Sequence, residues 1–150
     1  MSDNITDPET GLFSEAFLDA ELPLRVATAR RSLRQLGLVL VAYDARSFEL
    51  GAVAEAARAT LRDSDAACRL DDGRLALLLE LTPVDGSLRA ATRLRDALVT
   101  LDPEAQVWAG VATYPVHAID DRELRAAAEE ALARARRAER GTVEEAERPE

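Results

Sequence analysis

Apolar residues follow two different spacings along this chain, and the spacing indicates where helices and strands lie. Some stretches carry apolar residues three or four positions apart, which is typical of amphipathic helices. Shorter stretches are almost continuously apolar, which is typical of buried strands. The pattern predicts helices over residues 15–36, 48–62, 88–101 and 122–138, and strands over 38–41, 66–70, 75–79 and 107–113.

Local signals mark several of these boundaries. Ser14 is expected to cap the first helix, Pro23 to mark a kink or a new start within it, and Gly37 to end it. Pro83 and the pair Asp85-Gly86 are expected to close the third strand. After the first helix, the elements therefore follow in the order strand, helix, strand, strand, helix, strand, helix.

That order is the split-βαβ, ferredoxin-like arrangement. We predict an α/β (α+β) fold in which helices pack on a central, mostly antiparallel sheet. The 150 residues are enough for one domain with its own core. We assign residues 1–6 to an N-terminal tail, 7–140 to the domain and 141–150 to an acidic tail without regular structure.

Charge and composition narrow the classes of partner. The net charge is −9, and the acidic excess lies at the two ends of the chain. No basic stripe with interleaved aromatic residues occurs, which argues against a nucleic-acid polymer as a partner. Cys68 is the only cysteine, so no intrachain disulfide forms, and no apolar run is long enough to cross a membrane. We expect a soluble cytoplasmic protein with no membrane partner.

The most informative motif is the turn between the apolar runs 66–70 and 75–79. It reads Asp71-Asp72-Gly73-Arg74, and an Asp-Gly pair between such runs predicts a β-hairpin. With its flanking residues, the turn resembles the signature hairpin of the GGDEF family, the diguanylate cyclase domains of bacterial signalling. The five signature positions are here Asp71, Asp72, Gly73, Arg74 and Leu75.

Three further motifs extend the resemblance over residues 7–143. Asp7-Pro8-Glu9-Thr10-Gly11-Leu12 is similar to the Asp-x-x-Thr-Gly-Leu motif that leads into the family's first helix. Val111-Ala112-Thr113-Tyr114-Pro115 resembles its fourth-strand motif. Residues 128–140 resemble its closing helix, with Arg136 where a phosphate-contacting lysine is usual. The resemblance implies the palm-type GGDEF fold, which is the same ferredoxin-like architecture.

The resemblance also implies that this chain has lost the family's catalysis. In the family, two leading glycines let the backbone approach GTP, and acidic residues behind them hold Mg²⁺. Here Asp71 and Asp72 replace the glycines and would repel a triphosphate, while Gly73 and Arg74 replace the acids. Ala42 stands where a metal-binding aspartate is usual, and the segment after it is about a dozen residues shorter than the family norm, so the part that reads guanine is missing. We expect no metal, no cofactor and no enzymatic activity.

A second site of the family is retained. Arg62-Asp63-Ser64-Asp65 matches the Arg-x-x-Asp of the family's inhibitory site, which binds cyclic di-GMP. An arginine can grip a guanine edge or a phosphate, and an aspartate can accept hydrogen bonds from guanine. The family's supporting arginine corresponds to Arg93, with Arg89 one turn earlier. The resemblance implies a cyclic di-GMP site at Arg62, Asp65, Arg93 and Arg89. The alternative is that Asp65 only forms a turn and the arginines are ordinary surface charges.

Three other side chains have structural interpretations. His117 is the only histidine and is expected to be a solvated loop residue. Cys68 is expected to be a small core residue. Trp108 is expected to pack in the vacant substrate cleft, and contact with a partner is the alternative.

Two hypotheses of function follow. In the first, the chain is a catalytically inactive GGDEF-like signalling domain that binds cyclic di-GMP as a receptor or regulator. In the second, it is a pseudo-enzyme that serves as a protein-interaction or dimerisation module and binds no nucleotide. A protein partner or a homodimer is expected in either case.

Overall fold

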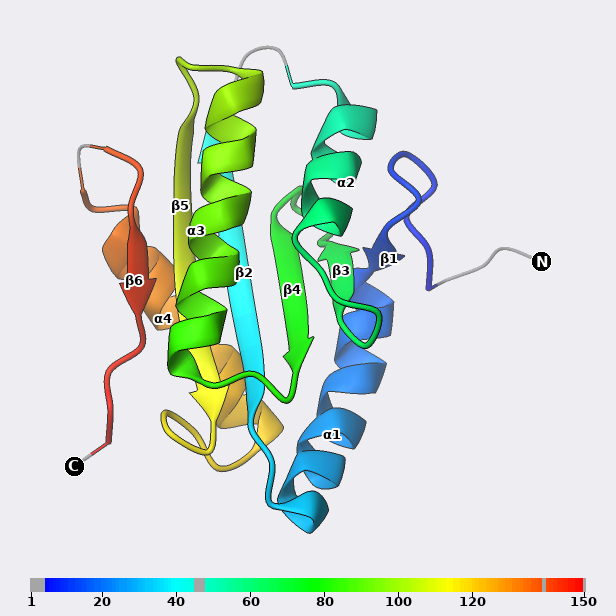
Figure 1. Ribbon diagram of the computed structural model, residues 1–150, viewed down its shortest axis with the longest axis vertical. Helices are drawn as coiled ribbons and strands as arrows, with labels where there is room; N and C mark the ends of the chain where they lie inside the picture. The colour runs from blue at the N-terminus through cyan, green and yellow to red at the C-terminus, as the bar shows by residue number, and fades with distance from the viewer. Residues whose placement is uncertain (1–4, 45–47, 139, 150) are drawn as a thin grey trace.

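A single six-stranded sheet organises the molecule. The computed structural model describes residues 5–44, 48–138 and 140–149. Within these residues, four helices surround a sheet whose strands lie in the order β1-β3-β4-β2-β5-β6 (Figure 1). In chain order the elements are β1 Phe13–Ser14, α1 Glu15–Ser32, β2 Leu36–Asp44, α2 Leu50–Ala59, β3 Ala66–Arg69, β4 Leu75–Glu80, α3 Val84–Leu101, β5 Gln106–Tyr114, α4 Asp121–Ala135 and β6 Val143–Glu145.

β2 is central, because it pairs antiparallel with β4 on one side and with β5 on the other. β3 also pairs antiparallel with β4. Together with α2 and α3, these four strands have the split-βαβ order, so the predicted ferredoxin-like, mostly antiparallel sheet is confirmed. Two short outer strands that the sequence did not predict, β1 and β6, add to the edges in parallel orientation.

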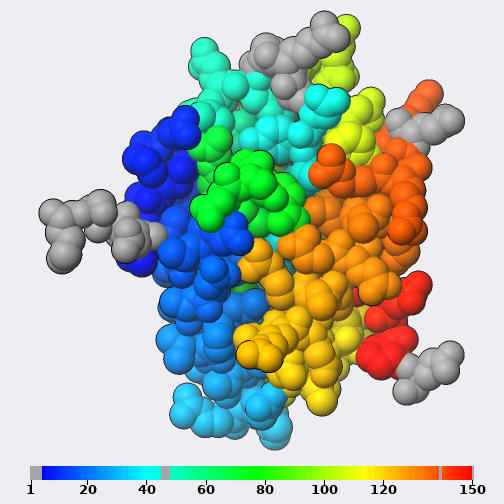
Figure 2. Space-filling model, turned by 180° about the vertical axis from the view of Figure 1, so that it is seen from behind, coloured from blue at the N-terminus to red at the C-terminus, as the bar shows by residue number. Residues whose placement is uncertain are grey.

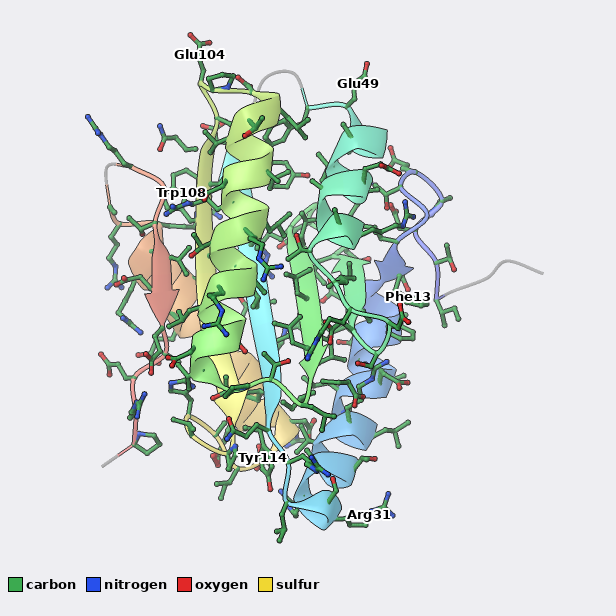
Figure 3. All side chains as sticks on the ribbon, in the orientation of Figure 1. Phe13, Arg31, Glu49, Glu104, Trp108 and Tyr114 are labelled. Atoms are coloured by element: carbon green, nitrogen blue, oxygen red, sulfur yellow. The ribbon has the colours of Figure 1, made fainter. Side chains whose placement is uncertain are left out.

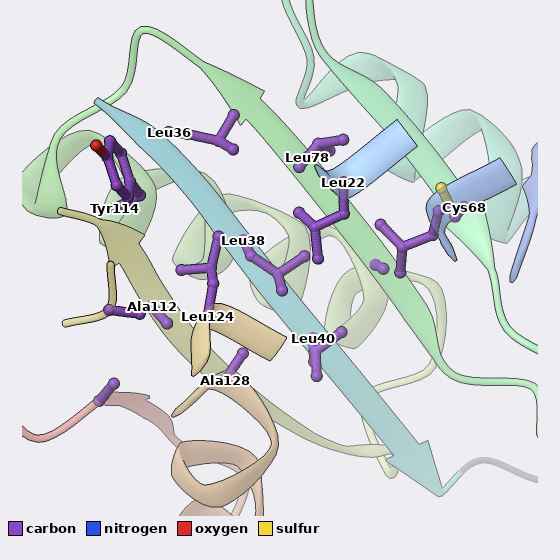
Figure 4. Close-up of a cluster of buried hydrophobic side chains, with 14 of the residues drawn as sticks. Leu22, Leu36, Leu38, Leu40, Cys68, Leu78, Ala112, Tyr114, Leu124 and Ala128 are labelled. Atoms are coloured by element: carbon purple, nitrogen blue, oxygen red, sulfur yellow. The ribbon is translucent and has the colours of Figure 1, made fainter. Parts of the chain in front are cut away.

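Helices cover both faces of the sheet. Along β2, Leu38 and Leu40 point to one face while Val39 and Val41 point to the other, and all four are fully buried. α1 and α4 cover the first face, and α2 and α3 cover the second (Figures 1 and 2). Figure 4 shows Leu38 close to Leu124 of α4. Burial on both faces explains why this strand is continuously apolar.

The first helix ends earlier than the sequence predicted. α1 stops at Ser32, and Leu33 follows it in the left-handed conformation with φ of 55° and caps the helix through its amide. Pro23 lies inside α1 without ending it. Gly37, predicted to end the helix, lies instead in β2, where a Cβ would stand 2.2 Å from Oγ of Ser87 on α3. The glycine therefore serves close packing of α3 on the sheet and not helix termination.

The third helix begins earlier than predicted. α3 starts at Val84, with Pro83 at its N-cap position, so Asp85 and Gly86 belong to its first turn. Pro83 does follow the end of β4, but the Asp85-Gly86 pair forms no turn there. The packing of Val84, which is largely buried, extends the helix toward the sheet.

The C-terminal segment is more ordered than the sequence suggested. Residues 141–150 were predicted as a tail without regular structure, but Val143–Glu145 form β6 beside β5. The predicted solvated state of His117 is wrong, because its side chain is fully buried with Nδ1 2.8 Å from the Thr113 amide and Nε2 2.7 Å from Oε2 of Glu145. The hydrogen bond from His117 lowers the pKa of Glu145, although burial opposes this. Contacts between distant segments order these residues, and a local pattern cannot predict such contacts.

Gly110 tests the packing of α4 on the sheet. A Cβ at this position would meet the Leu132 amide nitrogen at 2.3 Å and the Ala128 carbonyl oxygen at 2.5 Å, and a helix backbone cannot move aside locally. We expect Gly110→Ala to lower the free energy of unfolding by about 3 kcal/mol in urea titrations.

Gly51→Ala is the matched control for that change. It lies in α2 with nothing within 4 Å of the added Cβ, so we expect a gain of about 0.5 kcal/mol from helix propensity. Equal stabilities of the two variants would contradict the close approach of α4 to β5.

Candidate functional site

The signature turn joins β3 to β4 as a tight hairpin loop. The Leu70 amide donates to the Arg74 carbonyl oxygen at 2.8 Å, and the Gly73 amide donates to the Leu70 carbonyl oxygen at 2.9 Å. Gly73 has a φ of 90°, a backbone conformation that residues with a side chain rarely adopt. The predicted hairpin is therefore present, and the backbone of the turn requires the glycine.

Arg74 carries the strongest interactions of this turn. Its Nε lies 2.7 Å from Oδ2 of Asp72, and its Nη1 and Nη2 lie 2.6 and 3.1 Å from the two carboxylate oxygens of Glu129 on α4. The hydrogen bonds with Glu129 raise the pKa of Arg74. Burial raises the pKa of Asp72, but hydrogen bonds from the Arg74 backbone and side chain outweigh it and lower the pKa. The charges of Asp72 and Arg74 are thus paired within the protein.

These ion pairs continue into the helices behind the sheet. Glu129 also lies 3.6 Å from Arg125, and Arg125 reaches Glu15 at 3.2 Å and Asp19 at 3.3 Å, both on α1. Figure 2 shows the hairpin region in green between the blue N-terminal part and the orange C-terminal part of the chain. The network therefore links the signature turn to α1 and α4.

A cleft of about 340 Å³ lies beside the signature turn. We call it the signature cleft, and its lining residues are Ala42, Tyr43, Asp72, Gly73, Arg74 and Arg136. At the three positions where the family resemblance implies metal ligands, the cleft presents the methyl group of Ala42, Gly73 without a side chain and the cation of Arg74, and none of these offers Mg²⁺ a side-chain ligand. The described residues also include no group of three or more His, Cys, Asp or Glu side chains arranged for a metal ion. The residues of this cleft therefore do not fit a magnesium site.

Trp108 occupies part of the space beside this cleft. It lies opposite Ala42 in the β2–β5 register and packs against the core on the α1 and α4 side. The guanidinium carbon of Arg136 lies 5.4 Å from the centre of its ring, within cation–π range. Figure 3 shows Trp108 toward the start of β5. Trp108 therefore packs against the core beside the cleft and is not among the residues that line it.

The N-terminal motif forms a loop that is fastened to β3. Oδ2 of Asp7 accepts hydrogen bonds from the Thr10 amide at 3.0 Å and the Thr10 hydroxyl at 2.6 Å, and it lies 3.4 Å from Nη1 of Arg69. Gly11 within the loop has φ of 75°. Burial raises the pKa of Asp7, but the bonds from Thr10 and the charge of Arg69 outweigh it, so the pKa lies below its usual value. The motif has a structural role here.

A second hollow, of about 200 Å³, lies at the other end of β4. We call it the arginine pocket. It lies where α2 leads into β3 and where β4 leads into α3, and Figure 1 shows β4 running from the signature turn to this loop. Arg62, Asp65, Arg89 and Arg93, the four residues that the sequence predicted as a ligand site, all line it.

The four residues differ in how they are held. Arg62 Nη2 donates to the Glu80 carbonyl oxygen and to Thr82 Oγ1, both at 2.6 Å. The Asp65 side chain is only 3% exposed and accepts hydrogen bonds from the amides of Arg62 and Glu80. The side chains of Arg89 and Arg93 are exposed, and no hydrogen bond or ion pair joins either guanidinium to the described part of the chain. The pocket therefore combines a fixed wall with two unpaired cations.

Sequence reasoning missed several residues around the signature turn and in the arginine pocket. Glu129 gave no local signal, because its pairing with Arg74 joins segments that are distant in the chain. Thr82 and Gly86 also line the arginine pocket, and a Cβ on Gly86 would crowd Thr82 at 2.9 Å. Of these residues only Thr82 could have been anticipated, because it lies in the short loop between β4 and α3.

Comparison with known families identifies the class of protein. The family described as "Diguanylate cyclase, GGDEF domain" matches residues 49–142, and the chain belongs to this GGDEF family. No curated protein sequence matches the chain. None of the described helices is long and apolar enough to span a membrane.

Solved GGDEF structures share the fold over nearly the whole chain. The GGDEF domain of YfiN (TpbB) from Pseudomonas aeruginosa is 25% identical, with 95% of this chain and 94% of that chain covered at a TM-score of 0.83. That of DgcB from Caulobacter crescentus, solved in complex with cyclic di-GMP, is 19% identical, with 98% and 96% covered at 0.81. SiaD from Pseudomonas aeruginosa, solved with its activator SiaC, is 22% identical, with 95% and 62% covered at 0.83.

The lowered pKa of Asp7 predicts a contribution to acid stability. A carboxylate whose pKa is lower in the folded state stabilises the protein above the unfolded-state pKa, and this contribution is lost as the pH falls through the folded-state pKa. We expect Asp7→Asn to lower the free energy of unfolding by about 1 kcal/mol at pH 7 and to flatten its decline between about pH 5 and pH 2. Chemical denaturation at several pH values measures both effects. Asp63→Asn, at an exposed position, is the control, and an identical profile for the two variants would contradict the role of Asp7.

Proposed function

We propose that this GGDEF domain is catalytically inactive and acts in signalling by binding cyclic di-GMP in the arginine pocket. The single observation that carries the proposal is the convergence of Arg62, Asp65, Arg89 and Arg93 on one pocket. Arginines suit a dinucleotide because their forked donors match phosphate oxygens. DgcB, which shares the fold, was solved with cyclic di-GMP.

The absence of catalysis is supported by the chemistry of the signature cleft. Phosphoryl transfer by a family enzyme needs Mg²⁺ to stabilise the charge that develops on the reacting phosphate. Ala42 offers no ligand, and the Arg74 cation, paired with Asp72 and Glu129, would repel the metal. The exposed Asp71 carboxylate, which has no ion-pair partner among the described residues, would in turn repel a triphosphate. These changes act on metal and substrate together, so their effects reinforce each other.

A second candidate is a protein-interaction or dimerisation module. Large apolar side chains are exposed along and just after α1: Leu24, in the middle of the helix, is 62% exposed, and Leu33, which follows its end, is 93% exposed. Ile119, 63% exposed, lies near the same end, because its carbonyl oxygen accepts a hydrogen bond from Arg30. Exposed apolar clusters often mark protein contacts, and SiaD was solved with a protein activator. Under this function, partner capture from the native host would be unchanged in Arg62→Ala/Arg93→Ala.

Incubation with GTP and Mg²⁺ tests the loss of catalysis. We expect no cyclic di-GMP above an enzyme-free blank after several hours at micromolar protein, because typical enzymes turn over at about 1 s⁻¹ or faster and would give abundant product. Chromatography of the reaction mixture measures the product, and an active diguanylate cyclase under the same conditions is the positive control. Product that grows in proportion to the protein concentration would refute the proposal.

Calorimetric titration with cyclic di-GMP tests the binding function. We expect a Kd tighter than about 100 μM for the wild type. We expect the Arg89→Ala/Arg93→Ala variant to bind at least about tenfold more weakly, because hydrogen bonds to charged groups are each worth about 1.5–3 kcal/mol. Arg95→Ala is the matched control on the same helix, because Arg95 pairs with Asp96 and lies outside the pocket lining. If the wild type releases no heat, or if its Kd is weaker than about 100 μM, the result would favour the interaction module.

A further inference from the structure

The carboxylate that could read guanine in the arginine pocket is already engaged in the fold. Oδ1 of Asp65 accepts a hydrogen bond from the Glu80 amide at 2.9 Å, and Oδ2 accepts one from the Arg62 amide at 3.0 Å. With only 3% of the side chain exposed, a base has almost no access to it. Among the described residues that line the pocket, Asp65 is the only one with a carboxylate. The pocket therefore presents no exposed carboxylate to the guanine N1 and N2 hydrogens.

Arg62 is similarly committed. An Nη nitrogen carries two hydrogens, and Nη2 of Arg62 uses both on the Glu80 carbonyl oxygen and the Thr82 hydroxyl. Its Nε faces Oδ2 of Asp65 at 3.5 Å. A two-pronged grip on guanine O6 and N7 needs two neighbouring donors, and Nη1 alone cannot supply that geometry. Arg62 therefore fixes the α2–β3 loop against the β4–α3 loop.

Arg89 and Arg93 have no such commitments. They lie one turn apart on α3, so their Cβ atoms are about 5–6 Å apart. No described residue forms a hydrogen bond or ion pair with either guanidinium, and both line the pocket. Nη2 of Arg89 lies 3.9 Å from the place of a Cβ on Gly86, so the missing side chain leaves room beside it. Two unpaired guanidinium groups at this spacing suit a pair of phosphate groups, because each can donate two parallel hydrogen bonds to phosphate oxygens.

We infer that this pocket recognises the phosphates of a cyclic dinucleotide through Arg89 and Arg93 and discriminates little between guanine and adenine. Arg62 and Asp65 hold the shape of the pocket. This inference rests on the proposed binding function and adds to it the chemical class of the ligand, which is a cyclic purine dinucleotide and not cyclic di-GMP alone.

Parallel calorimetric titrations of the full chain with cyclic di-GMP and cyclic di-AMP test the inference. The two ligands share the phosphate ring and differ only in the base. One good two-pronged base contact changes affinity by about 5- to 150-fold, so we expect Kd values within about threefold of each other. Guanosine, a base without phosphate, should not compete at millimolar concentration.

Single-site variants separate the two pairs of residues. We expect Arg89→Ala and Arg93→Ala to weaken both dinucleotides by the same factor, at least about tenfold. Arg62→Ala should change both affinities equally and by less than about fivefold, and Arg95→Ala should leave both unchanged. Circular dichroism establishes that each variant is folded.

The results distinguish this inference from the binding function on which it rests. Binding of cyclic di-GMP at least about 30-fold tighter than cyclic di-AMP would overturn the inference and leave the binding function intact. A selective loss of cyclic di-GMP binding in Arg62→Ala would also overturn it. If neither dinucleotide binds, both the binding function and the inference fail.

Discussion

The burial of β2 on both faces is the constraint on which the rest of the structure depends. Its register pairs Leu36 with Glu80 and Val41 with Leu75 along β4. A shift by one residue would exchange the side chains that face α1 and α4 with those that face α2 and α3. Because both faces are packed, the register is fixed, and so are the two ends of β4. The signature turn follows from one end and the arginine pocket from the other.

Arg74 of the signature cleft differs from Arg89 and Arg93 of the arginine pocket mainly in having ion-pair partners within the protein. Arg74 is only 19% exposed in its side chain and is held by Asp72 and Glu129, so binding an external anion would require breaking strong internal pairs. Arg89 and Arg93 are exposed and lack ion pairs with the described residues. Binding a ligand phosphate would therefore remove water from their guanidinium groups but would break no internal ion pair. Arg74 is therefore held by partners within the protein, whereas the side chains of Arg89 and Arg93 remain accessible.

The sequence predicted the architecture well, because period and order of elements are local properties. The continuously apolar run of β2 and the Asp72-Gly73 turn could be predicted from neighbouring residues alone. The strand β6, whose Glu145 contacts the buried His117, could not be predicted in this way, because it depends on contacts between segments far apart in the chain. The convergence of Arg62 and Arg93 followed from family spacing, but the engagement of Asp65 by the Glu80 amide did not, because hydrogen bonds of a side chain to distant backbone leave no sequence signal.

The signature cleft and the arginine pocket lie far apart, so the loss of chemistry that we propose for the cleft would leave the shape of the pocket intact. They lie at opposite ends of β4, whose six residues span about 20 Å of buried sheet. Substitutions that far apart, without shared partners, act nearly independently on stability. Arg74 also satisfies its charge locally, on Asp72 and Glu129, so its presence places no unpaired charge against the core. The arginine pocket depends instead on the end of β4 near Glu80, where Asp65 and Arg62 are fastened. Under the proposed loss of catalysis the hairpin still completes the sheet, because β3 pairs with β4.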